Sequence, residues 1–600
     1  MKKLAKGSEQ ILGVVEGGEN GRFWLKSVDK KARFDTQIGD VGEAKAGDLV
    51  LAELTGNAQR KSARVTQVLG DPFAPKSFSL IAIHKYGIPF EMPEVAEREA
   101  ANVSQLPVTA DHREDLRHLP IIAIDPRDAR DFDDAIWAAP NADTGGFDAI
   151  VAIADVSYYV RPGSALDHEA AKRGNSVYFP DLVVPMLPHA LSSDKCSLRA
   201  GEDRAVIACH LAISKMGQVT SWRFTRAVAR ISANIPYPDA QAAIDGRSNA
   251  KTDVLLEGVL KPLWKAYGAL MKARAKREPL ELDLPERKLV LDDKGMVVRV
   301  VTPLRLDAHK LIEEFMIQAN AAAAEELEAK KTPQLYRVHE PPSEEKVRAL
   351  SMFLKTLDLS LPLGQVMKPK HFNQLLSEVK GKDYQNLVND VVLRTQAQAA
   401  YAPINKGHFG LTLRRYSHFT SPIRRYADLI VHRALISALG FGDDGLSADD
   451  ISRLSETAEM ISDAERRAMA AERETTDRLI AAHLAGQTGA HFRGRIGGVV
   501  GAGLFIKLND TGADGFIPVS SLGSDYFVYS DVTHSLIGQR TGETFQLGDQ
   551  VEVKLLEVAP VSGGLRFEMV SEGRKGKPQP QHHGRATRLS KPPPKSRKKR

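Results

Sequence analysis

Cysteines are scarce in the 600-residue sequence, and long hydrophobic runs are missing. The two cysteines, Cys196 and Cys209, have the spacing of neither a metal site nor a redox motif, which predicts buried thiols in a reducing compartment. No stretch reaches the ~18 apolar residues that a membrane span needs. The basic start, MKKLAKGSEQ, is not followed by the apolar core of a signal peptide. We therefore expect a cytoplasmic protein with no membrane partner.

Acidic side chains are missing from the C-terminal end of the chain. The whole sequence holds 82 Lys and Arg against 76 Asp and Glu, a formal net charge of +6. From Gly573 onward there are eleven Lys or Arg and no acid, so 71 basic residues face 76 acidic ones in the rest of the chain, a formal charge of −5. A segment of this composition, 572–600, is expected to be disordered and to attract polyanions without reading their sequence. The alternative is a tail that only aids solubility.

Short alternating strands separated by turn residues occur near both ends of the chain, at about 11–69 and 492–570, and predict two small β-barrels. The region between them, about 108–487, mixes strands such as DAIVAIADVSYYV with helices such as DAHKLIEEFMIQANAAAAEELEAKK. Another long helix, LSADDISRLSETAEMISDAERRAMAAERETTDRLIAAHL, keeps no steady heptad, which favours a packed helix over a coiled coil. The proline-containing segment 76–107 is expected to be a connector. The predicted fold class is multidomain α+β.

The stretch AIDPRDARDFDDA holds five aspartates within ten residues, directly after the apolar run PIIAI that predicts a buried strand. Four of them are singled out: Asp125, Asp131, Asp133 and Asp134. Clustering them costs free energy, because each carboxylate repels the others and loses water. Mg²⁺ prefers oxygen ligands, and two such ions ~3.5–4 Å apart can stabilise both the attacking and the leaving oxygen at phosphorus. A metal site would offset the cost; the alternative is a solvated loop balanced by Arg127 and Arg130.

A second unusual stretch is HFTSPIRRYADLIVHRALISAL. Its pattern predicts a helix capped by Thr420 or Ser421, with Pro422 in the first turn. Capping does not explain Arg424 and Arg425, because guanidinium groups in the first turn oppose the helix dipole unless an anion lies there. A phosphate would suit that place.

Five stretches in the central region carry a resemblance to a known family. In order, they are IDPRDARDFDDA, IADVSYYVRPGSALDHEAAKRGNSVYFPDLVVPMLPHALSSDKCSL, HKLIEEFMIQAN, LYRVHEPPS and HFTSPIRRYADLIVHR. Together they resemble the RNB family of exoribonucleases over nearly the whole central region. Within this family, the SVYFP and RVHEPP stretches and the Lys-rich tail are more similar to the ribonuclease R branch than to the ribonuclease II branch.

The resemblance implies a domain plan. Residues 1–75 would form a cold-shock-type OB-fold barrel, 108–487 the RNB catalytic domain, and 488–571 a C-terminal OB-fold barrel that binds RNA. The connector 76–107 and the disordered tail 572–600 complete the chain. Members of this branch usually carry two cold-shock domains, and only one is recognisable here.

The resemblance also implies an activity. It is the Mg²⁺-dependent, hydrolytic and processive degradation of single-stranded and structured RNA from the 3′ end to 5′-mononucleotides. The expected partners are single-stranded RNA and RNA with 3′ overhangs, and the enzyme is expected to be a monomer. The basic tail is a candidate for contacts with the ribosome or with the degradation machinery.

Matching motif to motif assigns roles to single residues. The metal ligands would be Asp125, Asp131, Asp133 and Asp134, and the catalytic residues would be Asp133, Asp134 and Arg424 at the scissile phosphate. The substrate-binding residues would be Tyr178 at the 3′-terminal base, Tyr237 further along the channel, Glu313 and Glu472 at the terminal nucleotide, and Arg425. Without the resemblance, Tyr178 and Tyr237 would more often be ordinary core aromatics.

Two other classes of protein share part of this pattern. A non-catalytic RNA-binding protein with the same fold would be recognised by the loss of one metal-site aspartate, and all four are present. An ATP-driven RNA remodeller would need the motif G-x-x-x-x-G-K-[ST], which does not occur. Opening of duplexes would then have to come from translocation alone.

We expect removal of residues 573–600 to weaken RNA binding at low salt, because the chain before them is formally acidic. In a plot of log affinity against log salt concentration, each phosphate neutralised on a single strand contributes roughly −0.7 to the slope. Removal of the tail should therefore flatten this slope by several units. A short, saturating single strand should still be digested, whereas structured RNA with a 3′ overhang should be digested more slowly. Binding and digestion of both RNAs across a salt series measure this. An unaltered slope would show that the tail only aids solubility.

Overall fold

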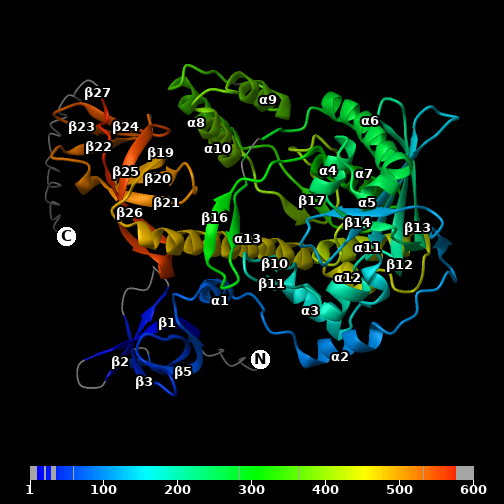
Figure 1. The fold of residues 1–600 in the computed structure, drawn as a ribbon, viewed down its shortest axis with the longest axis horizontal. Coiled ribbons are helices and arrows are strands. Elements are labelled where there is room, and N and C mark those ends of the chain that lie inside the picture. The colour runs from blue at the N-terminus through cyan, green and yellow to red at the C-terminus, as the bar shows by residue number, and fades with distance from the viewer. Residues whose placement is uncertain are drawn as a thin grey trace, which may run out of the picture. The chain divides into compact units, whose positions relative to one another are not determined.

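Figure 1 shows the computed structural model of the chain, which divides into two compact units. One unit runs to Gly486 and includes the short segment Val558–Gly564, and the other holds Gln487–Glu557 and the chain from Leu565 on. The structure describes residues 10–575 except 19–21, 29–34, 58–59, 283, 285, 363 and 532. The start MKKLAKGSE and the part of the expected tail at 576–600 therefore lie outside the described residues.

The N-terminal strands close into the first of the two predicted barrels, in the order β1-β2-β3-β5-β4. The strands are β1 (Gln10–Gly17), β2 (Phe23–Ser27), β3 (Thr36–Asp40), β4 (Leu49–Asn57) and β5 (Arg60–Gly70). Successive side chains of a strand point to opposite faces, so Leu25 of β2 is buried in the barrel core while its neighbour Trp24 is 38% exposed.

The expected connector is largely helical. It carries α1 (Pro75–Tyr86) and α2 (Glu94–Val103). Pro75 at the first position and the left-handed Gly87 after the last residue, with φ of 61°, set the limits of α1. Lys85 of α1 pairs with Glu474 of the long helix α13 (Leu454–Leu484), with 2.7 Å between Nζ and Oε1. The connector therefore packs on the central region.

The central region is built on a seven-stranded sheet with the order β14-β7-β8-β9-β12-β13-β6. Its strands are β6 (Glu114–Asp115), β7 (Ile122–Asp125), β8 (Asp134–Pro140), β9 (Phe147–Ala154), β12 (Asp203–Ile213), β13 (Val219–Arg230) and β14 (Ala233–Pro236). β14 and β6 pair in parallel with β7 and β13, and the other neighbours are antiparallel. Because β7 ends at Asp125 and the neighbouring antiparallel strand β8 begins at Asp134, the sheet places two of the predicted aspartates at adjacent strand ends.

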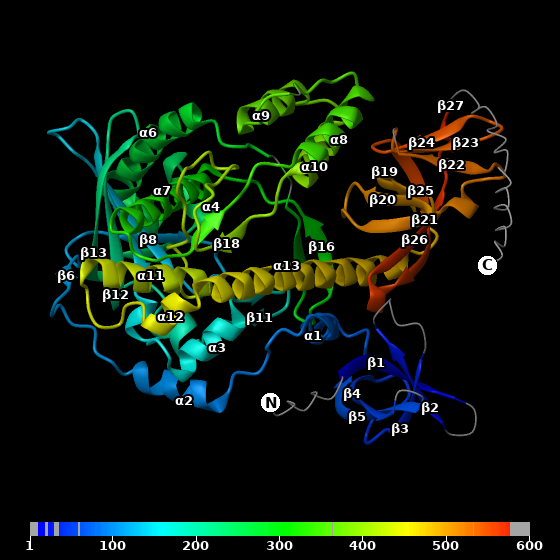
Figure 2. The ribbon, with the colours of Figure 1, turned by 180° about the vertical axis from the view of Figure 1, so that it is seen from behind.

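Helices cover both faces of this sheet. They include α3 (Ala165–Arg173), α4 (Tyr237–Ile244), α6 (Lys261–Arg277) and α7 (Asp307–Ala329). Ile122 and Ile124 of β7 belong to the hydrophobic layer with α4, α6 and α7, whereas Ala123 between them belongs to the layer with α2 and α3. Figure 2 shows these two groups of helices on opposite sides of the strands.

Further elements surround the sheet. They are α5 (Ala250–Leu255), α8 (Glu344–Lys355), α9 (Pro369–Glu378), α10 (Gln385–Thr395), α12 (Ala448–Ser452), and the strand pairs β10 (Val177–Tyr178) with β11 (Val183–Val184), β15 (Lys288–Leu291) with β16 (Val297–Val301), and β17 (Tyr336–Val338) with β18 (Ala400–Ala402). The stretch predicted as one long helix without a heptad forms two helices, α12 and α13, with a break at Arg453. Ile461 and Leu479 of α13 are buried, as predicted for a packed helix. None of the helices in the described ranges is long and apolar enough to cross a membrane.

The prediction that Thr420 or Ser421 caps a helix is wrong by four or five residues, because α11 spans Tyr426–Leu439 and its N-cap is Arg425. The predicted caps and the proline lie in a turn before it. In that turn the Ser421 N–H donates to Asp428 Oδ1 at 2.7 Å, and the Ile423 N–H donates to Asp133 Oδ1 at 2.8 Å. In a helix the backbone N–H groups of the first turn have no partner within the helix. Here the N–H groups of Ser421 and Ile423 instead bind the carboxylates of Asp428 and Asp133.

The second unit contains the other predicted barrel, closed in the order β19-β20-β21-β26-β25, and a four-stranded sheet β22-β23-β24-β27. The strands are β19 (His491–Val500), β20 (Gly503–Leu508), β21 (Asp514–Pro518), β22 (Phe527–Ser530), β23 (Ser535–Gly538), β24 (Glu543–Gln546), β25 (Gln550–Ala559), β26 (Gly564–Met569) and β27 (Arg574–Lys575). The prediction of disorder from residue 572 on is wrong for Arg574 and Lys575, which form β27, and the Gly573 N–H before this strand donates to Glu543 Oε1 at 2.8 Å. The predicted fold class is confirmed.

Candidate active site

Two strand ends and the loop between them hold the four predicted aspartates. Asp125 closes β7, and Asp134 opens the neighbouring β8. Ser197 fixes the loop, because its Oγ donates to Arg130 O at 2.8 Å and accepts from the Phe132 N–H at 3.0 Å. Sequence analysis did not single out Ser197, since its partners lie 67 and 65 positions away.

The carboxylates are too deeply buried for a solvated loop. Asp133 is 4% exposed, and the Oδ2 atoms of Asp125, Asp133 and Asp134 are buried without a hydrogen-bond donor among the described residues. Burial raises the pKa of Asp125 to about 6 and that of Asp133 to about 8, although Arg424 opposes both shifts. The pKa of Asp134 is raised well above its ordinary value by burial and by its two charged neighbours. Dehydration and repulsion therefore both disfavour the charged forms.

Arg424 is the arginine that the fold brings to this cluster. Its Nε lies 3.3 Å from Asp133 Oδ2, beside the bond from the Ile423 N–H to the other oxygen of the same carboxylate. Arg127, one of the two loop arginines considered as a balancing charge, instead pairs with Asp239, with 2.6 Å between Nη2 and Oδ1. The compensating charge thus comes from a segment 290 positions away rather than from Arg127.

Tyr178 and Glu472 meet beside the cluster. Tyr178 Oη donates to Asp131 Oδ2 at 2.6 Å, and its backbone N–H donates to Glu472 Oε1 on α13 at 2.8 Å. Tyr178 is 39% exposed, so it is not a core aromatic. A partly exposed ring is therefore fixed at its hydroxyl and at its backbone, next to a predicted metal ligand.

Tyr237 lies close to Asp125 because β14 pairs with β7. Pro236 is the register partner of Asp125, and Tyr237 follows it as the first residue of α4. The Tyr237 ring stacks on His309 of α7, with 4.1 Å between the ring centroids and 20° between the planes. Sequence analysis did not single out His309, because nothing in the sequence indicates which aromatic ring a histidine in the first turn of a helix will contact.

The remaining two predicted substrate residues are held in ion pairs. Glu313 on α7 pairs with Arg305 and with Arg274, whose Nη1 is 3.8 Å from Oε1. Arg425 pairs with Asp428, with 2.8 Å between Nη2 and Oδ1, and Asp428 is fully buried. Asp428 was also missed, and the only signal for it is a spacing of three positions from Arg425, which suits a pair on a helix.

The carboxylate cluster has the chemistry of a divalent-cation site. Buried oxygens without donors, on Asp125, Asp133 and Asp134, are the ligands that Mg²⁺ prefers. Within the part of the chain that the structure describes, no three His, Cys, Asp or Glu side chains already form a closed metal site. Asp131 is turned toward Tyr178. The residues therefore fit a cation by their donor atoms, and would have to reorient to surround it.

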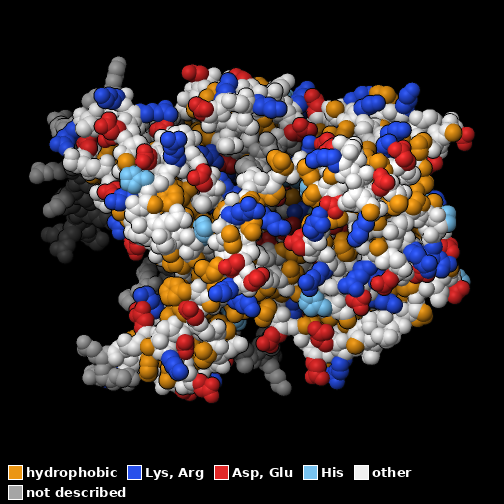
Figure 3. Space-filling model, in the orientation of Figure 1, with side chains coloured by type: hydrophobic (Ala, Val, Ile, Leu, Met, Phe, Trp, Pro, Cys, Tyr) orange, Lys and Arg blue, Asp and Glu red, His pale blue; other side chains and the backbone are white. Residues whose placement is uncertain are grey.

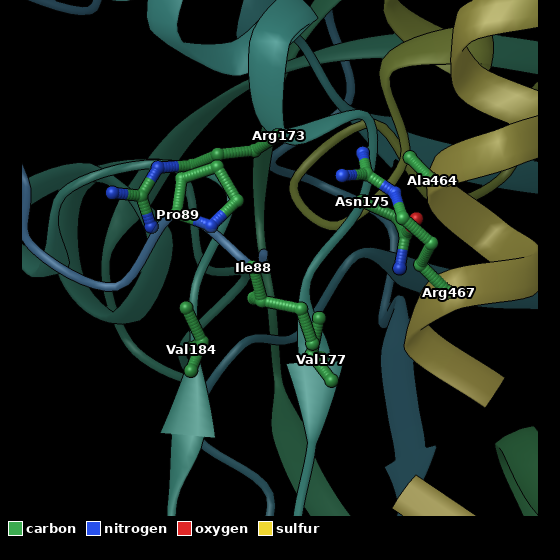
Figure 4. A pocket seen from close by; sticks show the side chains of 8 residues that line it. All are labelled: Ile88, Pro89, Arg173, Asn175, Val177, Val184, Ala464 and Arg467. Carbon is green, nitrogen blue, oxygen red and sulfur yellow. The ribbon is translucent and has the colours of Figure 1, made fainter. Parts of the chain in front are cut away.

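A small pocket lies beside the β10–β11 hairpin that carries Tyr178. Figure 4 shows Val177 and Val184 on its two strands, with Ala464 and Arg467 on α13. The lining holds no carboxylate, so this pocket does not add to the aspartate cluster. Figure 3 shows Lys and Arg side chains near the middle of the face drawn, interspersed with Asp and Glu side chains.

Three known domain families match the chain. The RNB domain matches residues 113–440, more than half of the chain, the cold shock domain matches 24–93, and the S1 RNA binding domain matches 486–569. Ribonuclease R of Vibrio parahaemolyticus is 38% identical in an alignment of 582 positions that covers 92% of this chain and 69% of that protein. Ribonuclease R of Escherichia coli is 37% identical in an alignment of 572 positions that covers 93% of this chain and 70% of that protein.

Solved structures are similar over nearly the whole chain. Mycoplasma genitalium RNase R in complex with ribose-methylated single-stranded RNA has a TM-score of 0.89 at 26% identity, over 94% of this chain and 90% of that one. The same protein with double-stranded RNA has a TM-score of 0.82 at 25% identity, over 94% and 96%. Yeast Ssd1, a pseudonuclease, has a TM-score of 0.67 at 17% identity, over 89% and 68%, and shares the fold alone. The site residues, not the fold, therefore have to decide between catalysis and binding.

We expect Asp134→Asn to raise the melting temperature of the metal-free protein at neutral pH, by about 2 °C or more. The raised pKa of Asp134 means that the folded state loses stability as the pH rises above the ordinary value of 3.8, and an amide removes this loss. Well below the ordinary value of 3.8 the carboxyl is protonated in the folded and the unfolded state, so the difference should vanish there. Thermal unfolding in EDTA across this pH range measures the effect.

Added Mg²⁺ provides the control for this prediction. A cation that binds the folded state should raise the melting temperature of the wild type more than that of Asp134→Asn. Equal melting temperatures in EDTA at neutral pH would contradict the burial penalty at Asp134.

Proposed function

The chain belongs to the RNB family and is an exoribonuclease, a hydrolase that acts on RNA, and from this premise we propose that it degrades RNA processively from the 3′ end, uses Mg²⁺ and releases 5′-mononucleotides. The observation that carries the proposal is the contact of Arg424 with Asp133, beside the buried Oδ2 atoms of Asp125, Asp133 and Asp134 that accept no hydrogen bond among the described residues. The ribonuclease R relatives and the solved RNase R complexes with RNA support the class of substrate.

In the proposed mechanism the cation is held by Asp125, Asp131, Asp133 and Asp134. The chemistry that it would supply is Lewis-acid activation of water and stabilisation of charge at phosphorus. Arg424, held beside Asp133, binds the scissile phosphate and neutralises the charge that develops on its oxygens. The Arg424 side chain is 43% exposed, which leaves it accessible to an incoming phosphate.

Aromatic side chains hold the end of the RNA in this proposal. Tyr178 stacks on the 3′-terminal base, because its exposed ring is already fixed by Asp131 and Glu472. Base stacking is worth ~1–3 kcal/mol and tolerates every sequence. Tyr237 stacks further along the strand, and Glu313 and Glu472 contact the terminal nucleotide.

The substrates proposed are single-stranded RNA and structured RNA with a 3′ overhang. The cold shock and S1 RNA binding domains on either side of the RNB domain support binding of longer RNA, and the RNase R complex with double-stranded RNA supports structured substrates. The free, buried Cys196 and Cys209 are consistent with the proposed cytoplasmic location. The monomeric state and the ribosome contacts of the tail are proposed from the sequence alone.

The alternative function is RNA binding without catalysis. Yeast Ssd1, titled a pseudonuclease, illustrates that this fold does not require activity. The four aspartates together with Arg424 favour catalysis here, because a protein that only binds RNA has no use for a cluster of buried carboxylates that repel phosphate.

The test is digestion of 5′-labelled RNA with Mg²⁺, in which labelled material should shorten from its 3′ end while unlabelled mononucleotides accumulate. Asp133→Asn should lower kcat by more than about 100-fold, as loss of one electrostatic contact to a transition state does. RNA binding in EDTA should change little, because affinity comes from backbone charge and stacking.

The matched control for this test is Asp128→Asn in the same loop. Asp128 is exposed and pairs only weakly with Lys288, with 3.5 Å between Oδ2 and Nζ, so kcat should not change. Early release of labelled mononucleotide would reverse the proposed direction. Near wild-type activity of Asp133→Asn would remove the aspartates from the mechanism.

We expect Tyr178→Ala to change the final product more than the rate on long RNA. Stacking contributes ~1–3 kcal/mol per base, and this share of the total binding grows as the bound RNA shortens. The variant should therefore stop at longer oligonucleotides, which a sequencing gel of the end products resolves. Tyr178→Phe keeps the ring and is the control, with an expected end product like that of the wild type. An unchanged product ladder for Tyr178→Ala would contradict the stacking role.

A further inference from the structure

The turn before α11 is attached to the segment that leads to Tyr178. Arg424 O accepts from the Ser176 N–H at 3.0 Å, and the Tyr426 N–H donates to Gly174 O at 2.9 Å. The backbone of this turn therefore contacts both Asp133 of the aspartate cluster and the segment that leads to the predicted base-binding ring. The turn also carries two guanidinium groups, those of Arg424 and Arg425.

Asp428 is the residue that both guanidinium groups depend on. It lies in the first turn of α11 and is fully buried. Its Oδ1 accepts from the Ser421 N–H at 2.7 Å and from Arg425 Nη2 at 2.8 Å. Ser421 Oγ in turn accepts from Arg424 Nη2 at 2.9 Å. One carboxylate oxygen therefore holds Arg425 directly and Arg424 through Ser421.

The two arginines differ in what they can offer a phosphate. The side chain of Arg424 is 43% exposed, whereas that of Arg425 is 21% exposed and its charge is matched by the fully buried Asp428. A phosphate could use Arg425 only by competing with Asp428, and breaking a buried ion pair is costly because one charge is left uncompensated. Arg424 can be approached from the solvent side without breaking that pair.

We propose that Asp428 is a positioning residue for the hydrolysis of RNA. With Arg425 it forms a buried, neutral pair that sets the turn from Ser421, and Arg424 alone meets the scissile phosphate. The inference rests on the proposed function, because it assigns the parts of that site. It changes the role of Arg425 from the expected substrate ligand to the partner of Asp428.

The first experiment compares RNA binding by Arg424→Gln and Arg425→Gln in EDTA, across a salt series. Each phosphate contact on a single strand contributes roughly −0.7 to the slope of log affinity against log salt. Arg424→Gln should flatten the slope by about this amount, and Arg425→Gln should leave the slope unchanged. A slope flattened equally by Arg425→Gln would show a direct phosphate contact and overturn the proposal.

The second experiment measures rescue between the two partners. Asp428→Asn and Arg425→Gln each leave one buried charge unpaired, so each should lower kcat by about 10–100-fold with little change in KM, as loss of a residue that orients a catalytic group does. The double variant joins two neutral amides that can still hydrogen-bond, and its kcat should exceed that of both single variants and return to within about 3-fold of the wild type. Absence of any recovery in the double variant would overturn the proposal.

Ser421→Ala tests the same link without creating a buried charge. It removes the Oγ acceptor of Arg424, while the Ser421 backbone N–H can still donate to Asp428. We expect a lower kcat at unchanged KM, even if the charge-leaving variants fail to fold. An unchanged kcat for Ser421→Ala would break the chain from Asp428 to Arg424 and overturn the proposal.

Asp444→Asn controls for a general loss of stability. Asp444 forms another buried pair, with 2.8 Å between its Oδ1 and Arg226 Nη1, and lies in the loop after α11. This variant should lower the melting temperature and leave kcat unchanged. If Asp444→Asn lowered kcat as much as Asp428→Asn does, loss of stability alone would explain the effect of Asp428, and the proposal would be overturned. Wild-type protein that released no nucleotides would overturn the proposed function itself, whereas an active wild type without rescue would overturn only the role of Asp428.

Discussion

Mutual repulsion among the buried carboxylates at the ends of β7 and β8 is the constraint around which the central region is arranged. Burial raises the pKa of Asp125 and of Asp133, and the neighbouring carboxylate of Asp131 adds to both shifts, so dehydration and repulsion disfavour the charged forms. The loop cannot relax, because Ser197 binds it and the two hydrophobic layers of the sheet fix both strands. A site held under such electrostatic stress gains free energy when a cation and a phosphate provide the missing partners.

The turn before α11 supplies the positive charge that this arrangement needs. Its Ile423 N–H binds Asp133 in place of a helical role, and this geometry places Arg424 beside the same carboxylate. The neighbouring pair of Arg425 and Asp428 adds no net charge. Two adjacent arginines that look equivalent in sequence therefore have different consequences, since one is neutralised in the interior and the other remains partly exposed.

Two hydrogen bonds of Tyr178 connect the proposed catalytic site to the proposed binding site for the RNA end. Tyr178 shares a hydrogen bond with Asp131, and Glu472 of α13 holds its backbone. A change in the position of the ring is thereby coupled to a carboxylate of the cluster. Yeast Ssd1, a pseudonuclease, shares this fold, so the architecture alone does not decide activity.

Local pattern was sufficient to predict the architecture and part of the site. The two barrels, the helix α7 and the long α13 follow from strand alternation and helical periodicity, and the aspartates could be found because they lie within ten residues of one another. The start of α11, the stacking of Tyr237 on His309 and the partner of Arg425 were not predicted. Propensity and spacing act between neighbours in the chain, so the sequence by itself determined which side chains were available. Only the tertiary structure decided which of them meet, because the decisive bond from Ile423 to Asp133 joins groups 290 positions apart, and it displaces a helix start that local capping rules favour.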